Sequence, residues 1–358
     1  MNITLNNRKA LSCIVIASMT MYLLKLITGN DIFLTLYICL SISSIVPMIL
    51  IKANVSIKYL VSVLLSISII IFFSFFSSSY DLQSAFIGAT YITTTVILLW
   101  ATHESRNELF IARFIFYSLL VYIAPFIVTY GISNPDAYND ILSGASRNMV
   151  SALIIVFSCF HIASYVKLKR KYPIFVPLAS FVCCFMLFGR SGIVISFFIL
   201  SICAINVFDK KYTAILLCMI AFLVVYYYVD ISEYIMTKTN FAVGTDSQRS
   251  TMLSQYTSNM SLSDVVFGNE YSRCCSEIVR FDNNPHNSFL NGHARYGLSH
   301  AIIVLSLVAI AFKKSTKLSI ALLIAILSRY SVDQIGLFSP IDLVILYLVF
   351  CCPRQSHL

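Results

Sequence analysis

Charged residues are scarce in this sequence. They make up 11% of its 358 residues, whereas about a quarter of the residues in an ordinary soluble domain carry a charge. Hydrophobic residues make up 58% of the chain, and there is a single tryptophan. With so few charges and so much apolar surface, the composition excludes an ordinary soluble protein.

The apolar residues come in blocks of membrane-spanning length, separated by short polar segments. A helix needs about 20 apolar residues to cross the hydrocarbon core of a bilayer, and backbone groups cannot stay unpaired in lipid. The sequence therefore predicts an all-α protein, a polytopic transmembrane helical bundle that forms one membrane domain over residues 1–358. We expect about twelve spans, over residues 10–28, 32–51, 59–77, 85–101, 109–131, 149–166, 174–189, 192–208, 212–229, 297–312, 317–330 and 340–352.

The basic residues of the polar segments predict the orientation of the chain. Short segments opposite the N-terminus carry only Arg147, Arg190 and Arg329. Segments on the side of the N-terminus carry many more, namely Arg8, Lys9, Lys52, Lys58, Arg106, Lys167, Lys169, Arg170, Lys171, Lys210, Lys211, Lys313, Lys314, Lys317 and Arg354. Because cytoplasmic loops are enriched in lysine and arginine, we expect both termini in the cytoplasm and the large polar loop 230–296 outside it. This distribution also accounts for the net charge of +9, so we expect no nucleic-acid partner.

One arginine lies at an unusual place. Arg190 belongs to the sequence Gly-Arg-Ser-Gly at 189–192, which joins two predicted spans. Such a short connection holds the arginine at the outer membrane face or slightly inside it. A charge at that depth is costly without a partner, and charges within membranes are usually functional. Arg190 is therefore a candidate site residue.

The loop 230–296 combines arginines with a histidine beside the membrane. Its arginines are Arg249, Arg273, Arg280 and Arg295, and its candidate proton acceptor is His286. Guanidinium groups grip phosphate oxygens in a two-pronged geometry, and histidine can transfer protons near neutral pH. These residues favour chemistry on a lipid-linked phosphate. In the competing interpretation, the arginines are ordinary solvated loop residues and His286 belongs to a turn or a helix cap.

Three motifs occur in an order that matches a known family. The first is Phe-Gly-Arg-Ser-Gly at 188–192. The second is Arg249, followed about twenty residues later by the pair Phe267-Gly268. The third is His286-Asn287, followed after nine residues by Gly297. In this order, and on a chain with about twelve predicted spans, the motifs resemble those of the O-antigen ligase and O-antigen polymerase superfamily of bacterial inner membranes. The family's usual second glycine, three residues after Gly297, is replaced here by His300.

The resemblance implies a multi-pass inner-membrane glycosyltransferase of lipopolysaccharide biosynthesis, with its large loop in the periplasm. Such an enzyme moves a glycan from undecaprenyl diphosphate to an acceptor hydroxyl. By motif position, Arg190 and Arg249 would bind the diphosphate and neutralise the leaving group. His286 would act as the general base. Arg280 is a further candidate for the diphosphate.

The expected partners follow from this chemistry. They are the undecaprenyl-diphosphate-linked glycan donor and acceptor, the membrane, and a chain-length-regulating protein. We expect no cofactor and no metal site, since a diphosphate is already a good leaving group. The loop also has no Asp-x-Asp pattern.

Four functions stay open on this evidence. The form of the 188–192 turn, the short chain and the compact loop favour a polymerase, which joins lipid-linked repeat units. A ligase, which transfers the polymer to lipid A core, would use the same donor. A polysaccharide transporter or flippase can also have twelve helices, but its charges usually lie near the membrane midplane. A non-catalytic scaffold or sensor would need none of the candidate residues.

Other polar residues have simpler interpretations. We expect His161 to form a hydrogen bond between helices, and Asp333 to be a solvated or paired loop charge with a lesser chance of contacting sugar hydroxyls. The spacing of His293 and His300 is not that of a metal site. Tyr226-Tyr227-Tyr228 reads as an interfacial anchor. Neighbouring cysteines seldom bridge each other, so Cys274 and Cys275 have no assigned role.

Overall fold

The computed structural model describes residues 2–53, 57–77, 82–131, 135–208, 211, 248–258 and 260–353. Regular structure within these ranges is helical throughout, apart from two isolated β-bridges, which confirms the predicted all-α class. The helices of the first part of the chain are α1 (Asn2–Thr28), α2 (Asp31–Ser43), α3 (Ile45–Leu50), α4 (Ile57–Phe76), α5 (Leu82–Ser105), α6 (Glu108–Tyr130), the 3-10 helix η1 (Pro135–Asp140), α7 (Arg147–Lys167), α8 (Phe175–Met186) and α9 (Arg190–Val207).

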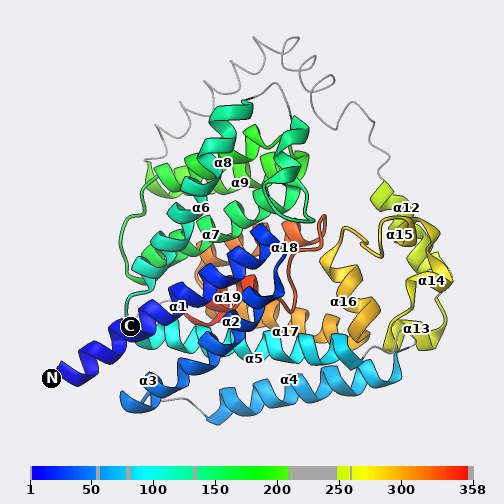
Figure 1. Cartoon of the computed structure of the whole chain (residues 1–358), viewed down its shortest axis with the longest axis horizontal. Helices are drawn as coiled ribbons and strands as arrows, with labels where there is room; N and C mark the ends of the chain where they lie inside the picture. Colours follow the sequence, from blue (N-terminus) through cyan, green and yellow to red (C-terminus); the bar gives the residue numbers. More distant parts are fainter. Residues whose placement is uncertain are drawn as a thin grey trace.

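The second part of the chain has shorter helices before it returns to long ones. They are α12 (Gln248–Ser258), α13 (Leu262–Phe267), α14 (Tyr271–Cys274), α15 (Ser276–Arg280), α16 (Ser288–Tyr296), α17 (Leu298–Lys314), α18 (Lys317–Tyr330), the 3-10 helix η3 (Pro340–Asp342) and α19 (Leu343–Phe350). Figure 1 shows α12 to α15 to one side of the larger bundle.

Six helical segments in the described part of the chain are long and apolar enough to cross a membrane. They cover Thr4–Thr28, Asp31–Leu50, Ala85–Ser105, Glu108–Tyr130, Arg147–Lys167 and Arg190–Val207. Three shorter apolar helical segments, Val61–Phe76, Phe175–Met186 and Pro340–Phe350, coincide with further predicted spans. Helices α17 and α18 coincide with the predicted spans 297–312 and 317–330. The predicted span 212–229, which contains the three consecutive tyrosines, lies outside the described residues.

Helix α7 forms the centre of the bundle. Of its apolar stretch 89% is buried, against 33% in α1, α6 and α9. It contacts α6, α8, α9, α18 and α19. Small residues such as Ser151, Ala152 and Ser158 allow this close approach, and the two serine hydroxyls bond to backbone carbonyls of their own helix. A helix packed on all sides needs such a surface because no face is left for water or lipid.

His161 does not form the expected interhelical hydrogen bond. It is fully buried in α7, and no described residue bonds to either ring nitrogen. The centroid of its ring instead lies 5.5–5.6 Å from the ring centroids of Phe116, Tyr117 and Tyr165. The prediction was therefore wrong: aromatic packing, and not a polar partner, holds this histidine.

The described end of the predicted loop 230–296 forms a second, smaller core. Helices α12, α15 and α16 enclose Met252, Tyr256, Ile278 and Leu290. His293 is part of the same cluster, because its Nδ1 lies 2.9 Å from the hydroxyl of Tyr256 and its Nε2 lies 2.9 Å from the carbonyl oxygen of Val265. The carbonyl can only accept, so Nε2 donates and Nδ1 accepts. We call helices α12 to α16 the outer helix cluster.

His300 stands where the resembling motif has a glycine, and Gly292 leaves space for its ring. His300 is buried in the first turn of α17 and lies over Gly292 of α16, where a side chain would collide with the imidazole ring. Phe289 and Phe338 contact the same ring, with centroids 6.5 and 5.3 Å away. His300 therefore packs α17 against α16.

Candidate active site

The backbone around His286 is fixed by the two asparagines that flank it. The side chain of Asn284 accepts a hydrogen bond from the backbone N–H of His286, at 2.9 Å. The side chain of Asn287 caps α16 by accepting from the N–H groups of Phe289 and Leu290, at 2.9 and 3.0 Å. An asparagine is well suited to such a cap because its oxygen replaces the missing carbonyl partner of the first turn. The His-Asn motif therefore places the histidine directly before a helix.

His286 adopts a backbone conformation that is uncommon for a residue with a side chain. Its φ angle is +48°, in the left-handed region. Residues held in that region cost free energy and tend to gather at functional sites. Phe188, the first residue of the 188–192 turn, has a φ of +58°. Two of the three sequence motifs therefore contain a strained non-glycine residue.

The surroundings of His286 favour its neutral form. Partial burial lowers the pKa of its imidazole below the ordinary value of 6.5, and the positive charge of Arg249 lowers it further, while Asp333 acts in the opposite direction. The ring lies edge-on to Phe281, with centroids 5.6 Å apart. A neutral imidazole has a free lone pair at neutral pH, so His286 can accept a proton from a hydroxyl group.

Asp333 connects two arginines from different parts of the fold. Arg249 Nη2, in the first turn of α12, lies 3.2 Å from Asp333 Oδ1. Arg329, in the last turn of α18, pairs with Asp333 Oδ2. The side chain of Arg329 is fully buried and that of Asp333 is 8% exposed, whereas Arg249 is 34% exposed. The aspartate thus links the outer helix cluster to the bundle. Part of the Arg249 side chain remains accessible.

Arg329 also reaches the turn that carries Arg190. Its Nη1 donates to Ser191 Oγ at 2.6 Å, and its Nη2 donates to the carbonyl oxygen of Asn148 at 2.6 Å and to Ser151 Oγ at 2.9 Å. Both serines therefore accept hydrogen bonds from a buried guanidinium group. Charge-assisted bonds of this kind are stronger than bonds between neutral groups, so they hold the turn firmly.

The glycines of this turn allow a close approach to two side chains of α7. A side-chain carbon at Gly189 would stand 2.7 Å from Asn148 Oδ1, and one at Gly192 would stand 2.9 Å from Ser151 Oγ. Arg190 is the first residue of α9 and is partly exposed. The positive end of a helix dipole and an arginine at the same place both attract anions.

The candidate residues fall into two groups. A chain of polar contacts and charge effects connects His286, Arg249, Asp333 and Arg329 and continues to Ser191, next to Arg190. We call these six residues the charged junction. Arg280 lies apart from these contacts: its side chain is 73% exposed, and its Nη1 lies 3.8 Å from Glu277 Oε1 within α15.

Two members of the charged junction were not recognised as such in the sequence. From the sequence, Arg329 is only a basic residue of an outer segment, and Asp333 is a loop charge, solvated or paired. The pairing is the form that the structure has. The signal that could have shown it is their spacing: Asp333 follows Arg329 by four residues and lies just beyond the end of α18, where the two side chains can still meet.

Ser288 fixes the segment that follows Asp333. Its hydroxyl donates to the carbonyl oxygen of Asp333 at 2.8 Å and accepts from the N–H groups of Ile335 and Gly336, at 2.9 and 3.2 Å. Ser288 opens α16 two residues after His286. The segment that carries the aspartate is therefore bonded to the start of the helix that follows the histidine.

A disulfide joins Cys274 to Cys275 in the outer helix cluster. The expectation that these neighbours would not bridge was wrong. The bond links the last residue of α14 to the residue before α15, and Cys275 is buried beside Tyr256 and Ile278. It therefore belongs to the small core rather than to the charged junction.

No protein-family model, no curated protein and no solved structure matches this chain. Within the described residues, no group of three or more His, Cys, Asp and Glu side chains has an arrangement that could hold a metal ion. The likeness to the O-antigen superfamily accordingly rests on the three sequence motifs, and the function has to be argued from the charged junction itself.

Proposed function

We propose that this protein is an O-antigen polymerase, a membrane glycosyltransferase that joins undecaprenyl-diphosphate-linked oligosaccharide units. The observation that carries the proposal is the charged junction. A histidine with a lowered pKa lies within the electrostatic reach of a partly exposed arginine, and a buried Arg–Asp pair connects that arginine to the turn of Arg190. Transfer of a glycan from a diphosphate needs a base to take the proton of the acceptor hydroxyl and cationic groups to neutralise the leaving diphosphate.

The proposal includes an orientation in the bacterial inner membrane. The chain would cross it about twelve times, with both termini in the cytoplasm and residues 230–296 in the periplasm. The excess of basic residues on the side of the N-terminus supports this arrangement. The disulfide between Cys274 and Cys275 supports it as well, because disulfides persist in oxidising compartments such as the periplasm.

In the proposed reaction, the acceptor hydroxyl oxygen attacks the anomeric carbon of the donor glycan. His286 takes the hydroxyl proton as the new carbon–oxygen bond forms. The bond from the anomeric carbon to the diphosphate breaks, and its electron pair leaves with the diphosphate oxygen. Arg249 and Arg190 neutralise that growing negative charge, which is commonly the largest contribution to such a reaction.

Arg329 and Asp333 would act as positioning residues. Asp333 holds the guanidinium group of Arg249 in one orientation, and Arg329 fixes both Asp333 and Ser191. A pre-oriented arginine loses little freedom when it binds an anion, which favours binding of the diphosphate. Arg280 contributes less in this proposal because it is exposed and lies beside Glu277.

A lipopolysaccharide gel tests the proposal. A strain that lacks the chain is complemented with the wild type, His286→Ala or Arg249→Ala, with protein levels checked by immunoblotting. Arg273→Ala is the matched control, since Arg273 is 65% exposed and lies 3.3 Å from Glu270. We expect the wild type and the control to restore the ladder of repeat units, and the two site variants to fail at normal protein levels.

The deletion strain distinguishes the candidate functions. A single repeat unit on lipid A core identifies a polymerase, whereas complete loss of capped core identifies a ligase. If both His286→Ala and Arg249→Ala restore the full ladder, the catalytic assignment is wrong, and a transporter or scaffold becomes the better interpretation.

A further inference from the structure

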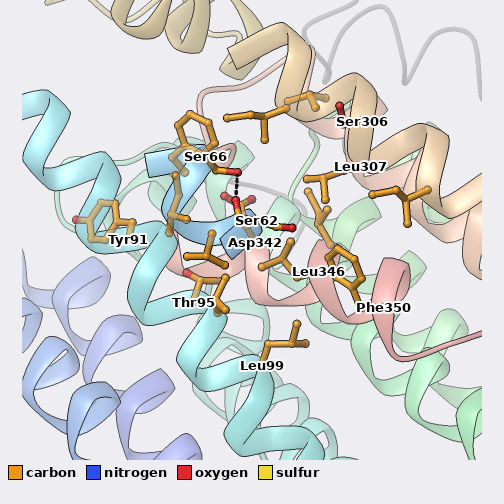
Figure 2. Close-up of a pocket in the computed structure, with 18 of the residues that line it drawn as sticks. Ser62, Ser66, Tyr91, Thr95, Leu99, Ser306, Leu307, Asp342, Leu346 and Phe350 are labelled. Atoms are coloured by element: carbon orange, nitrogen blue, oxygen red, sulfur yellow. Dashed lines mark hydrogen bonds between the residues drawn. The ribbon is translucent and has the colours of Figure 1, made fainter. Parts of the chain in front are cut away.

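A partly open cavity of about 580 Å³ lies between helices of the bundle, away from the charged junction. Helices α4, α5, α17 and α19 surround it, and the segment 337–339 forms part of its wall (Figure 2). Most of the surface consists of aliphatic and aromatic carbon, contributed by side chains such as Leu99, Leu307, Leu346 and Phe350. The volume is that of a typical binding site for a small molecule.

The cavity is elongated along α5. Tyr91, Thr95 and Leu99 line it together with residues further along the same helix, ending at His103 and Glu104. These positions recur at the helical period and therefore form one face. With a rise of 1.5 Å per residue, the face from Tyr91 to Glu104 is about 20 Å long. Each leaflet of a bilayer has a hydrocarbon thickness of about 15 Å, so the cavity is long enough for one hydrocarbon chain.

Several polar atoms in the wall already have partners within the protein. Ser66 donates to the carbonyl oxygen of Ser62 at 2.8 Å, as Figure 2 shows. Thr95 donates to the carbonyl oxygen of Ser339 at 3.5 Å. The carboxylate of Asp342 accepts from the N–H groups of Leu337 and Ser339, at 3.1 and 2.7 Å. These groups stabilise the wall itself, which leaves carbon as the main surface for an occupant.

The two ends of the cavity differ in character. Phe338 lies at the end toward the charged junction. Its ring centroid is 5.1 Å from that of Tyr296 and 5.3 Å from that of His300. The side chain of the neighbouring Leu337 is only 9% exposed. At the other end, the side chain of His103 is 54% exposed and its Nδ1 lies 3.5 Å from Glu104. Side chains thus obstruct the route toward the junction, while the opposite end has polar and exposed residues.

Basic residues lie beyond the polar end. Ile310 of α17 lines the cavity, and the exposed Lys313 and Lys314 follow one helical turn later, at the end of that helix. Trp100 of α5 lines the same part of the cavity. Tryptophan is favoured at the boundary between hydrocarbon and headgroups, and lysines there attract anionic lipids. The charges therefore suit a phosphate headgroup at this end.

We propose that the cavity holds one acyl chain of an anionic phospholipid, whose phosphate lies near Lys313 and Lys314. The lipid comes from the leaflet on the side where α5 and α17 end, and it is a tightly bound component rather than a substrate. Its acyl chain fills the space between α4, α5, α17 and α19 and supports the wall formed by the segment 337–339. The inference does not depend on the proposed transferase activity.

Native mass spectrometry of the full-length protein in detergent tests the proposal. Wild-type protein should retain one phospholipid per chain after extensive washing. Val96→Trp places a large ring in the cavity and should lower the retained phospholipid about tenfold, a factor equal to about 1.4 kcal/mol of binding free energy. Val121→Trp is the control, because Val121 is 72% exposed on α6. The thermal unfolding midpoint reports whether each variant folds.

A photoreactive phosphatidylglycerol with a diazirine in the middle of its acyl chain tests the position without a cavity variant. Cross-links should map to α5 and α17. The double variant Lys313→Gln/Lys314→Gln should lower the cross-linking yield several-fold, whereas Arg170→Gln/Lys171→Gln, which removes two exposed charges elsewhere, should not. Cross-links confined to outward residues such as Val121, retention of a polyprenyl phosphate in place of a phospholipid, or no retained lipid would each overturn the proposal.

Discussion

The bundle and the outer helix cluster are stabilised in different ways. The bundle buries a continuous set of apolar residues around α7, and many of its serines and threonines bond to carbonyls of their own helix. The outer helix cluster encloses a core of few residues and adds a Tyr256–His293 hydrogen bond and a disulfide. A small core buries too little surface to be stable by itself, so the outer cluster needs specific polar links.

One of these links is at the boundary between the two regions. Arg249 belongs to the outer helix cluster, Asp333 to the connection between bundle helices, and their ion pair joins the two. His286 and Ser288 lie at the same boundary. The candidate site therefore lies where the two regions meet, and its residues also link the outer helix cluster to the bundle.

His286→Ala should have the largest effect on activity. Loss of a general base costs about 10²- to 10⁴-fold in rate, while the half-buried ring contributes little to stability beyond its contact with Phe281. Transfer of a lipid-linked repeat unit by purified protein in liposomes measures the rate, and the thermal unfolding midpoint measures stability. A variant that loses both equally would assign His286 a structural role.

The pH dependence of the same residue has a defined direction. Because burial and Arg249 lower the pKa of His286 below 6.5, the neutral, proton-accepting form predominates at neutral pH. The transfer rate should rise with pH through this lowered pKa and then level off. The free energy of unfolding should also rise with pH in this range, because the folded state binds the His286 proton more weakly than the unfolded state. The stability contributed by His286 is therefore fully present above about pH 6.5 and decreases below it. A rate profile that falls as pH rises through this range would contradict the assignment.

Asp333→Asn should have the largest effect on the link between the two regions. The buried guanidinium group of Arg329 would lose its counter-charge, and breaking a buried ion pair in this way costs about 3–5 kcal/mol. Limited proteolysis should then cleave the outer helix cluster faster than the bundle. Asp282→Asn, at an exposed position with a φ of +53° that asparagine tolerates, is the control. Unchanged proteolysis in Asp333→Asn would show that Arg249 does not hold the two regions together.

Tyr256→Phe should have a smaller effect, confined to the outer helix cluster. The variant loses the hydroxyl bond to His293 Nδ1 and the longer bond that the hydroxyl accepts from the N–H of Asn269, but it keeps the ring in the core, which costs about 1 kcal/mol per bond lost. Hydrogen exchange should increase in α12 and α16 and stay unchanged in α7. Tyr117→Phe, on the exposed surface of α6, serves as the control. Faster exchange throughout the bundle would contradict the separation of the two cores.

The smallest effect is expected from Cys274→Ser/Cys275→Ser. The bond closes a very short loop, so it restrains the unfolded chain little, and its removal should lower stability by about 1 kcal/mol or less. Mass spectrometry after alkylation, with and without a reductant, measures whether the wild-type pair is bridged. Free thiols in protein isolated under non-reducing conditions would remove one of the two observations that support a periplasmic loop.

The motifs in the sequence identified part of the candidate site before its geometry was known. His286, Arg249 and Arg190 all lie in or next to one chain of contacts. Arg280 could not be separated from them by sequence, because an exposed loop arginine and a phosphate-binding one look alike. Arg329 and Asp333 were missed since their importance depends on what surrounds them. A four-residue spacing shows that two side chains can meet, but not that the pair is buried or that it binds Arg249.

The class of the molecule follows from the sequence: the length and apolarity of its blocks permit only helices, because backbone groups in lipid must pair within their own segment. So do local features such as the Asn287 cap, which depend on neighbouring residues. Which helix is central, which charges are buried and where the cavity lies depend on how the helices pack together. Those properties arise from contacts between residues far apart in the chain, such as Arg329 with Ser191 and Thr95 with Ser339, and no local pattern encodes them.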